Sequence, residues 1–589
     1  MNRLCHYLSN RRQNFLAHTS ITVESAPWLM RDLEKIDTAA SRPSTRSHQR
    51  QDDSPSITRV YSAPHIDNQA VFYPEPEEEL ETNASSTLSS DHADANNDVE
   101  NAQPAELEKS QTSKSQRSQR DPKLVAWKGP DDVENPKNWS MGKRWAAVFV
   151  VSCFTFISPV SSSMVAPALS TIATDLKIQN EVELEMTLSI FVLAYAIGPL
   201  FLGPLSEMFG RVIVLQVANL FYLVWNIACG VARTRGQLIA FRFLSGLGGS
   251  APLAIGGGVL SDCFRPEERG KAMAIYSVAP LLGPAVGPIA GGFIAENTTW
   301  RWVFYATSIA DGVIQVAGFF LLQETYAPVL LKRKAEKLRK ETGDPSWHTE
   351  FETPDRSIFS VLRTSLIRPF RLLFTQPIIQ VLALYMAYMY GLMYLMLASF
   401  PTLWSSPNRY HESVGIGGLN YISLGLGFFI GAQISSRLID RVYRTLKAKN
   451  NGVGKPEFRT PMLCIGAVLN PIGLFIYGWT AQYQTHWIGP NIGACIFAAG
   501  TIISFQCIQT YVVDSYTRFA ASGLAAAVVL RSAAGFGFPL FAPYMFKALD
   551  YGWGNSLLGF ISIGIGFPAP ILLWKFGERL RKMSTYAAG

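Results

Sequence analysis

Long apolar runs constrain this chain more than any other feature of its sequence. From Trp145 onward the sequence consists largely of apolar stretches of about 20 residues, separated by short polar connections. A helix that rises 1.5 Å per residue needs about 20 residues to cross about 30 Å of hydrocarbon. Because a backbone exposed to lipid has no water to bond with, each run that crosses a bilayer must be helical. The sequence therefore predicts an all-α membrane protein.

The apolar runs number twelve and form two sets of six, which a longer polar stretch separates. Two equal halves are typical of secondary transporters, in which repeats enclose a binding site near the middle of the bilayer. The predicted spans are 145–167, 184–205, 211–231, 237–261, 271–295, 302–322, 376–402, 414–437, 460–480, 486–512, 521–547 and 554–576. The predicted parts of the chain are a disordered cytoplasmic tail (1–140), a first six-helix bundle (141–322), a central cytoplasmic loop (323–375), a second six-helix bundle (376–577) and a cytoplasmic tail (578–589).

The first 140 residues differ in composition from the rest of the chain. They are rich in Ser, Gln, Asp, Glu and Arg and lack apolar periodicity, so they cannot bury enough apolar surface to offset chain entropy. The start of the chain has no apolar core of signal-peptide length, and its scattered Arg residues leave a mitochondrial presequence as an alternative. Over the whole chain only 16% of residues are charged. Soluble domains carry about 25%, which excludes an ordinary soluble enzyme.

Basic residues predict the side of the membrane that each connection faces, because cytoplasmic loops carry an excess of Lys and Arg. With the N-terminus inside, the cytoplasmic connections are the more basic set, so we expect both termini in the cytoplasm. Residues 332–340 form a basic amphipathic helix in the central loop, which would lie either on the anionic inner leaflet or in solvent as a linker. The other cytoplasmic basic residues are Arg265, Arg269, Lys271, Arg441, Arg444, Lys447, Lys449, Lys455, Arg459, Lys575, Arg579, Arg581 and Lys582.

Three charged residues are predicted to meet at the cytoplasmic mouth. Glu207 and Arg211 lie in the stretch GPLSEMFGRVIVL between the second and third spans, and Asp262 ends the fourth span. An ion pair there can act as a latch between conformations. The stretch resembles the cytoplasmic signature of the major facilitator superfamily, although Met208 stands where that signature usually has a basic residue and Glu207 where it usually has Asp.

Arg242 lies inside the apolar run of the fourth span. An intramembrane charge costs several kcal/mol unless it is paired or hydrated, so it normally faces a cavity. The position matches the fourth-span Arg of the same superfamily, with Gly246 four residues later. The alternative is an Arg that extends to the outer interface.

Small residues recur along the fifth span with near-helical spacing. They make a smooth face on which another helix can roll, and the stretch APLLGPAVGPIAGG resembles the antiporter signature of proton-coupled drug exporters. Close packing alone is the alternative role. The residues are Gly283, Gly287, Pro288, Gly291 and Gly292.

Several shorter stretches narrow the resemblance. NPKNWS, LSDCFRPEERGKAMAIYSVAPLLGP, ETYAPVLLKRKAEKLRK, PEFRTPM, YVVDSY and RSAAGFGFPLFAPYMF together resemble the fungal branch of twelve-span drug:proton antiporters, over about residues 130–580. That branch includes polyamine exporters, antifungal-resistance pumps and toxin exporters. The resemblance implies a monomer in the plasma membrane, with the vacuolar membrane as an alternative. It implies a small-molecule substrate, protons and lipid as partners, and neither a cofactor nor a nucleic acid.

The seventh span carries a face of methionine and tyrosine. Flexible thioethers and aromatic rings with a hydroxyl suit a site for varied apolar ligands. Packing of this face against lipid or other helices is the alternative. The face holds Met386, Met389, Met393 and Met396, with Tyr390 and Tyr394 beside it.

Few charged residues lie deep in the spans. Arg531 is near the middle of the eleventh span, where it would pair with a substrate carboxylate or respond to a neighbouring acid. Asp311 is the one acid deep within a span, which makes it a candidate for proton coupling, although a structural hydrogen-bonding role is the alternative. Asn297 begins a glycosylation sequon on an outer loop, so close to the membrane that we expect little modification.

These patterns predict a proton-coupled exporter of an amphipathic drug, toxin or fungal metabolite that works by alternating access. A polyamine exporter is one alternative, although a polycation needs carboxylates that the spans largely lack. A membrane sensor that binds without transporting is another. No GxxxxGK[ST] loop, nucleophile–base set or metal-binding cysteine spacing is present in the sequence, so an enzyme is not expected.

Removing residues 1–120 should leave transport intact, because their composition cannot form a core. Flux through the truncated and full-length proteins is to be compared at matched surface expression. A loss of more than about tenfold per molecule, equal to about 1.4 kcal/mol in a barrier, would show that the tail is required.

Overall fold

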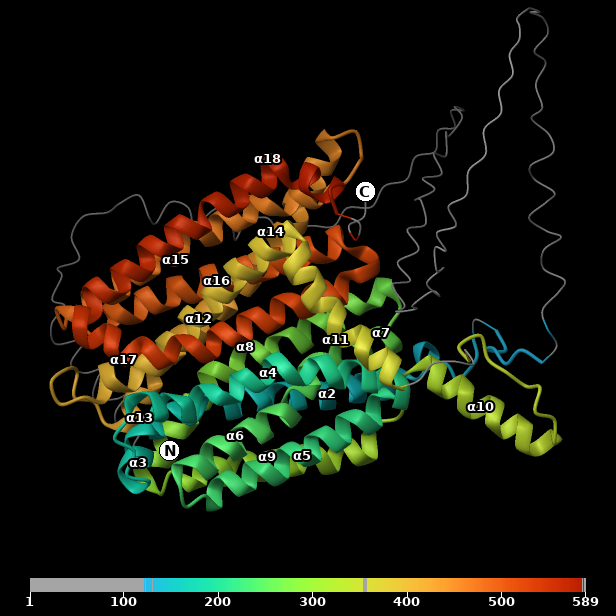
Figure 1. The fold of residues 1–589 in the computed structure, drawn as a ribbon, viewed down its shortest axis with the longest axis horizontal. Helices are drawn as coiled ribbons and strands as arrows, with labels where there is room; N and C mark the ends of the chain where they lie inside the picture. Colours follow the sequence, from blue (N-terminus) through green and yellow to red (C-terminus); the bar gives the residue numbers. More distant parts are fainter. Residues whose placement is uncertain (1–120, 122, 130, 353–357, 585, 587–589) are drawn as a thin grey trace, which may run out of the picture. The chain divides into compact units, whose positions relative to one another are not determined.

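The computed structural model describes residues 121, 123–129, 131–352, 358–584 and 586 (Figure 1). The predicted tail therefore lies outside the described residues up to position 120. Within the described residues the fold is helical, with one isolated β-bridge between Leu124 and His348.

The helices follow the predicted spans. Among the described residues, eleven segments are long and apolar enough to cross a membrane, and the last of them, Ala520–Lys582, contains two predicted spans. The first half consists of α2 (Met141–Ser163), α3 (Leu169–Asp175), α4 (Glu181–Phe209), α5 (Arg211–Val231), α6 (Arg235–Gly249), α7 (Ala251–Cys263), α8 (Pro266–Asn297) and α9 (Arg301–Leu321). Next come α10 (Ala327–Thr342) and α11 (Ile358–Thr375). The second half consists of α12 (Pro377–Ser405), α13 (Val414–Leu419), α14 (Ile422–Lys449), α15 (Thr460–Gln482), α16 (Ile488–Ser515), α17 (Ala520–Gly566) and α18 (Pro568–Lys582).

The long helix α17 reverses direction in its middle. Asp550 has φ 55° and ψ −176°, which are not helical, so the chain turns there. Before the turn, Gly523 approaches Ile379 and Gly535 approaches Tyr390; after it, Gly566 approaches Tyr385. The two parts of α17 therefore pass α12 in opposite directions, which accounts for the predicted eleventh and twelfth spans.

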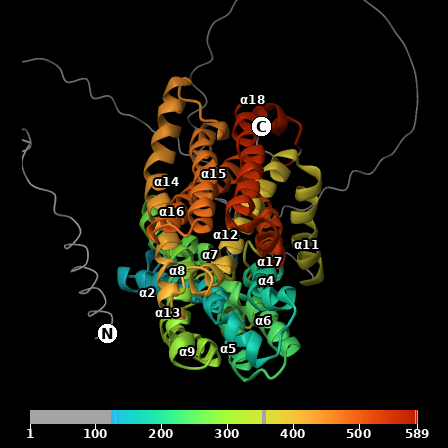
Figure 2. The same ribbon diagram turned by 90° about the vertical axis from the view of Figure 1, so that its left-hand side faces the viewer.

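The two halves pack side by side, as both views show (Figures 1 and 2). Within the first half α2 packs on α8 and α4 on α6; within the second, α15 packs on α16 and α12 on α17. The halves meet where α17 contacts α4 and where α13 and α14 contact α8. This arrangement gathers α2, α4, α12, α16 and α17 around the centre of the protein.

The chain before α2 packs against α10. Val125 is 5% exposed and forms an apolar cluster with Leu331 and Ala335 of α10, to which Trp127 adds its ring. The N–H of Val125 donates to the carbonyl of His348 at 2.7 Å. The apolar side of α10 is thus covered by protein, which favours the solvated linker over a helix that lies with its apolar side on the inner leaflet. It also means that residues 123–140, assigned to a disordered tail from composition, include a packed segment.

Charge pairs hold this segment on α10. Nζ of Lys334 lies 2.5 Å from Oε2 of Glu134 and 3.6 Å from Oδ2 of Asp132. The backbone N–H of Lys128 donates to Asp132 and holds the pKa of that carboxyl below its ordinary value, and Lys334 lowers it further. The signal missed in the sequence is the short apolar pair of Val125 and Trp127 within a polar region.

Val125→Asp should release the segment before α2 from α10, because a carboxylate in the apolar cluster costs more than about 1.4 kcal/mol, a tenfold change in equilibrium. Trypsin cleavage after Lys123 and Lys128 should then be roughly tenfold faster. Val133→Asp is the matched control, since Val133 is 80% exposed. Equal cleavage of both variants would contradict the packed segment.

Candidate functional site

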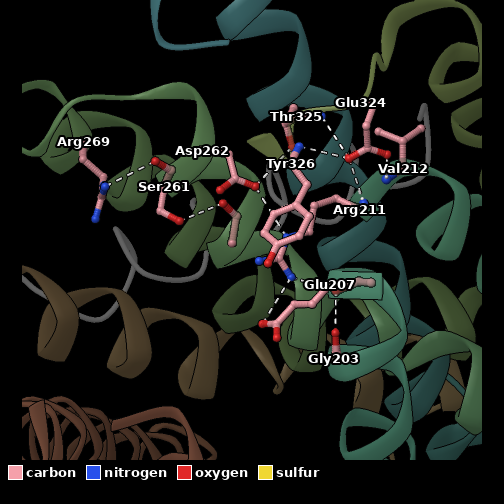
Figure 3. A network of polar contacts seen from close by, with 12 residues as sticks. Gly203, Glu207, Arg211, Val212, Ser261, Asp262, Arg269, Glu324, Thr325 and Tyr326 are labelled. Atoms are coloured by element: carbon pink, nitrogen blue, oxygen red, sulfur yellow. Dashed lines mark hydrogen bonds and ion pairs between the residues drawn. The ribbon is translucent and has the colours of Figure 1, made fainter. Parts of the chain in front are cut away.

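Arg211 is the centre of a polar cluster where α4 meets α5. A single residue, Gly210, joins the two helices, and its φ of 106° lies in the left-handed region that favours glycine. Nε of Arg211 lies 3.4 Å from Oδ2 of Asp262, and its Nη1 lies 3.8 Å from Oε1 of Glu207 (Figure 3). The three residues predicted to form a latch are therefore neighbours in this structure.

Glu324 belongs to this cluster, and the sequence analysis missed it. Its carboxylate accepts the backbone N–H of Arg211 at 2.9 Å and that of Val212 at 3.2 Å. An anion at the first turn of α5 satisfies donors that the helix leaves unpaired and interacts favourably with the helix dipole. Tyr326 places its ring 4.6 Å from the Arg211 guanidinium carbon. The feature of the sequence that could have indicated this role is the position of Glu324, in the stretch ETY just after the sixth span.

Arg242 is fully buried, with 0% of its surface exposed. Its guanidinium donates to four backbone carbonyls, those of Ser161, Ser162, Thr187 and Leu188, at 2.9 to 3.2 Å. These contacts join α6 to α2 and α4. The alternative of an Arg that extends to the outer interface is therefore wrong: the side chain points inward and disperses its charge over carbonyl dipoles. Its predicted role in lining a substrate cavity stays a prediction.

The glycines of α8 lie where another helix leaves no room for a side chain. A Cβ on Gly283 would lie 2.6 Å from Cβ of Pro159, and one on Gly287 would lie 2.7 Å from the carbonyl oxygen of Val160. A Cβ on Gly291 would meet Met164. Contacts this short essentially never occur in proteins, so α8 packs on the backbone of α2.

The same helix meets the second half of the protein near its C-terminal end. A Cβ on Gly292 would lie 2.8 Å from the carbonyl oxygen of Val414, and one on Gly418 would lie 3.1 Å from that of Pro288. Glu296 accepts the N–H of Gly415 at 2.8 Å. We call this region the Glu296 end, and the opposite region, with Gly210 and Asp262, the Arg211 end. At the Glu296 end, α8 of the first half and α13 of the second half are thus in close contact.

The methionine and tyrosine face of α12 is inside the protein. Met386, Met389, Met393 and Met396 are at most 6% exposed, and Tyr390 and Tyr394 are 9% and 1% exposed. The face is therefore not packed against lipid, which was one alternative. The Tyr394 hydroxyl lies 3.1 Å from Oγ of Ser162 in α2, so this face forms part of the contact between the halves.

Arg531 approaches the same face from α17. Its guanidinium carbon lies 4.9 Å from the centre of the Tyr390 ring, within cation–π range. Its Nε is buried and has no hydrogen-bond partner. The ring of Tyr390 also lies 5.1 Å from that of Tyr394 and 6.0 Å from that of Phe505, centre to centre. A half-buried cation therefore lies among aromatic rings at the centre of the protein.

Comparison with known proteins agrees with this geometry. Residues 151–539 match the Major Facilitator Superfamily. The chain belongs to that superfamily. It is 56% identical over 472 residues to "Efflux pump vrtL" of Penicillium aethiopicum, covering 80% of this chain and 92% of that protein. It is 43% identical over 466 residues to "Efflux pump radE" of Floropilus chiversii, covering 79% and 86% of the two proteins.

A solved structure shows the same fold. The xylose transporter XylE from E. coli, in a partially occluded inward-open conformation, aligns with a TM-score of 0.54 and 15% identity. The alignment covers 74% of this chain and 98% of that chain. The family match and the named efflux-pump relatives show that this major facilitator protein is a multi-pass membrane transporter and not an enzyme.

Two residues with predicted roles in this major facilitator lie away from the methionine and tyrosine face of α12. Asp311 is buried between α9 and α5, where both of its carboxylate oxygens accept from Nδ2 of Asn219 at 3.0 and 3.1 Å. This contact is the hydrogen-bonding arrangement that was the alternative to proton coupling. Asn297 is exposed at the end of α8 and donates to the carbonyl of Phe293 at 2.8 Å. Both assignments stay predictions.

Exchanging the charges of Arg211 and Asp262 should restore more transport than either single substitution allows. The two side chains are 11% and 19% exposed. A pair of this kind contributes on the order of 1 kcal/mol, enough to bias two conformations of similar energy. Arg211→Asp, Asp262→Arg and the double variant are to be compared for flux per molecule. Glu341→Lys, which breaks an exposed pair with Lys337, should have no effect. A double variant no better than the two single ones would contradict the latch.

Proposed function

We propose that this transporter exports an amphipathic organic compound, a drug, toxin or fungal secondary metabolite, in exchange for protons. The observation that carries the proposal is the 56% identity, over most of both chains, to a fungal protein named an efflux pump. The close packing of α8 on α2 supports it, since that stretch resembles the antiporter signature of proton-coupled exporters.

Alternating access would break the contacts between the two halves at one end at a time. Basic residues assign the Arg211 end to the cytoplasm and both termini with it. The backbone contacts of Gly292 and Glu296 with α13 join the halves at the other, outer end. We infer that this conformation is closed to the outside, and that rocking of the halves would open it. The working unit would be a monomer in the plasma membrane, with the vacuolar membrane as the alternative.

Charge argues against the polyamine alternative. A polycation needs carboxylates where it binds, and the central face instead holds the guanidinium of Arg531. A sensor would bind the compound without transporting it, so only a measurement of flux distinguishes a sensor from an exporter.

The test compares metabolites retained by cells with and without this protein in the organism that encodes it. Deletion should raise the intracellular level of at least one amphipathic metabolite roughly tenfold while lowering it in the medium, and a protonophore should do the same to wild-type cells. Gly287→Val should behave as the deletion, because its side chain would collide with α2. Gly312→Val is the matched control, since a Cβ there meets nothing within 4 Å. Export would be contradicted if the distribution of metabolites were unchanged, or if their intracellular level fell, in the cells that lack the protein.

A further inference from the structure

Among the described residues Arg531 has no carboxylate partner, whereas other arginines of the spans pair with acids or, like Arg242, donate to several carbonyls. Of the arginines in the described spans, Arg211 pairs with Asp262, Arg459 with Asp514 at 2.9 Å, and Arg581 with Glu457 at 3.0 Å. Arg531 has Nε buried without a hydrogen-bond partner and the ring of Tyr390 as its neighbour. A cation–π contact alone offsets little of the cost of burying part of a guanidinium.

The helices around Arg531 offer no carboxylate to neutralise it. The sequences of α2 and α12 contain no Asp or Glu, and α4 has none between Leu188 and Ser206. α16 has only Asp514 and α17 only Asp550, both far along their helices. Asp514 pairs with Arg459, and Asp550 pairs with Arg409 at 2.5 Å. Among the described residues, these five helices therefore supply no anion beside Arg531.

Aromatic side chains surround Arg531. The ring of Tyr390, which faces the guanidinium, also contacts the rings of Tyr394 and Phe505, at 5.1 and 6.0 Å between ring centres. Oγ of Ser162 in α2 lies 3.1 Å from the Tyr394 hydroxyl, so a polar group of the first half reaches the same region. Aromatic faces stack on planar ring systems.

We propose that this centre recognises amphipathic aromatic compounds that carry a negative charge, such as a carboxylate or an ionised phenol. The anion would pair with the Arg531 guanidinium, and the ring system would pack against Tyr390, Tyr394 and Phe505. The proposal rests on the export function proposed above and names its substrate class. Neutral analogues lose the charge-assisted hydrogen bond, and cationic ones are repelled.

The test measures equilibrium binding to the purified full-length protein in detergent, with no gradient and no flux. The probes are 1-pyrenebutyrate, which has a carboxylate, and 1-pyrenebutanol, its neutral counterpart with the same rings. Pyrene fluorescence reports both dissociation constants. The wild type should bind the acid about tenfold or more tightly than the alcohol, the size expected for a hydrogen bond to a charged group.

Three variants decide whether Arg531 is responsible. Arg531→Met should abolish the preference for the acid while its retained affinity for the alcohol shows that the protein is folded. Arg531→Lys keeps the charge and should keep most of the preference. Arg444→Met is the matched control, because Arg444 is exposed at the cytoplasmic end of α14.

A wild type that binds the two probes equally, or neither of them, would overturn the proposal, as would an unchanged preference in Arg531→Met. These outcomes differ from failure of the export function. Selective binding of the acid by a protein that moves no compound would leave this inference standing and remove the exporter.

Discussion

Charges inside apolar helices have to be neutralised or dispersed by groups within reach, and this requirement governs how the helices of this protein meet. Arg242 joins three helices because four backbone carbonyls disperse its charge. Arg211 fixes the junction of α4, α5 and α7 through Asp262 and Glu207, and Glu324 completes that junction by capping α5. Each of these two arginines fixes the position of one helix against another. Apolar contacts alone would allow the helices to slide along each other.

Glycine provides the second constraint, because it decides where helices can approach most closely. α8 packs on α2 through Gly283 and Gly287 and on α13 through Gly292. One helix therefore contacts its own half through one set of glycines and the other half through another. A movement of the halves that separates α8 from α13 leaves the packing of α8 on α2 intact, which is what rigid rocking requires.

Sequence patterns predicted the helices well, because apolar run length is set by bilayer thickness alone. The neighbourhood of Glu207, Arg211 and Asp262 was also predicted, since a family signature fixes its position. Contacts between distant segments were not predicted. The packing of Val125 on α10 and the capping of α5 by Glu324 each depend on residues far apart in the chain. The buried environment of Arg242 depends in the same way on carbonyls whose positions only the folded helices determine.

The central claim is that the two halves move as units, so that opening one end closes the other. Spin labels at Thr298 and Asn408 would report the distance between the halves at the Glu296 end, and labels at Lys271 and Asn451 the distance at the Arg211 end. Double electron–electron resonance at pH 8 and pH 5 should show the two distances changing in opposite directions, since the proton is the proposed driving ion. Distances that stay constant, or that change in the same direction, would contradict the account.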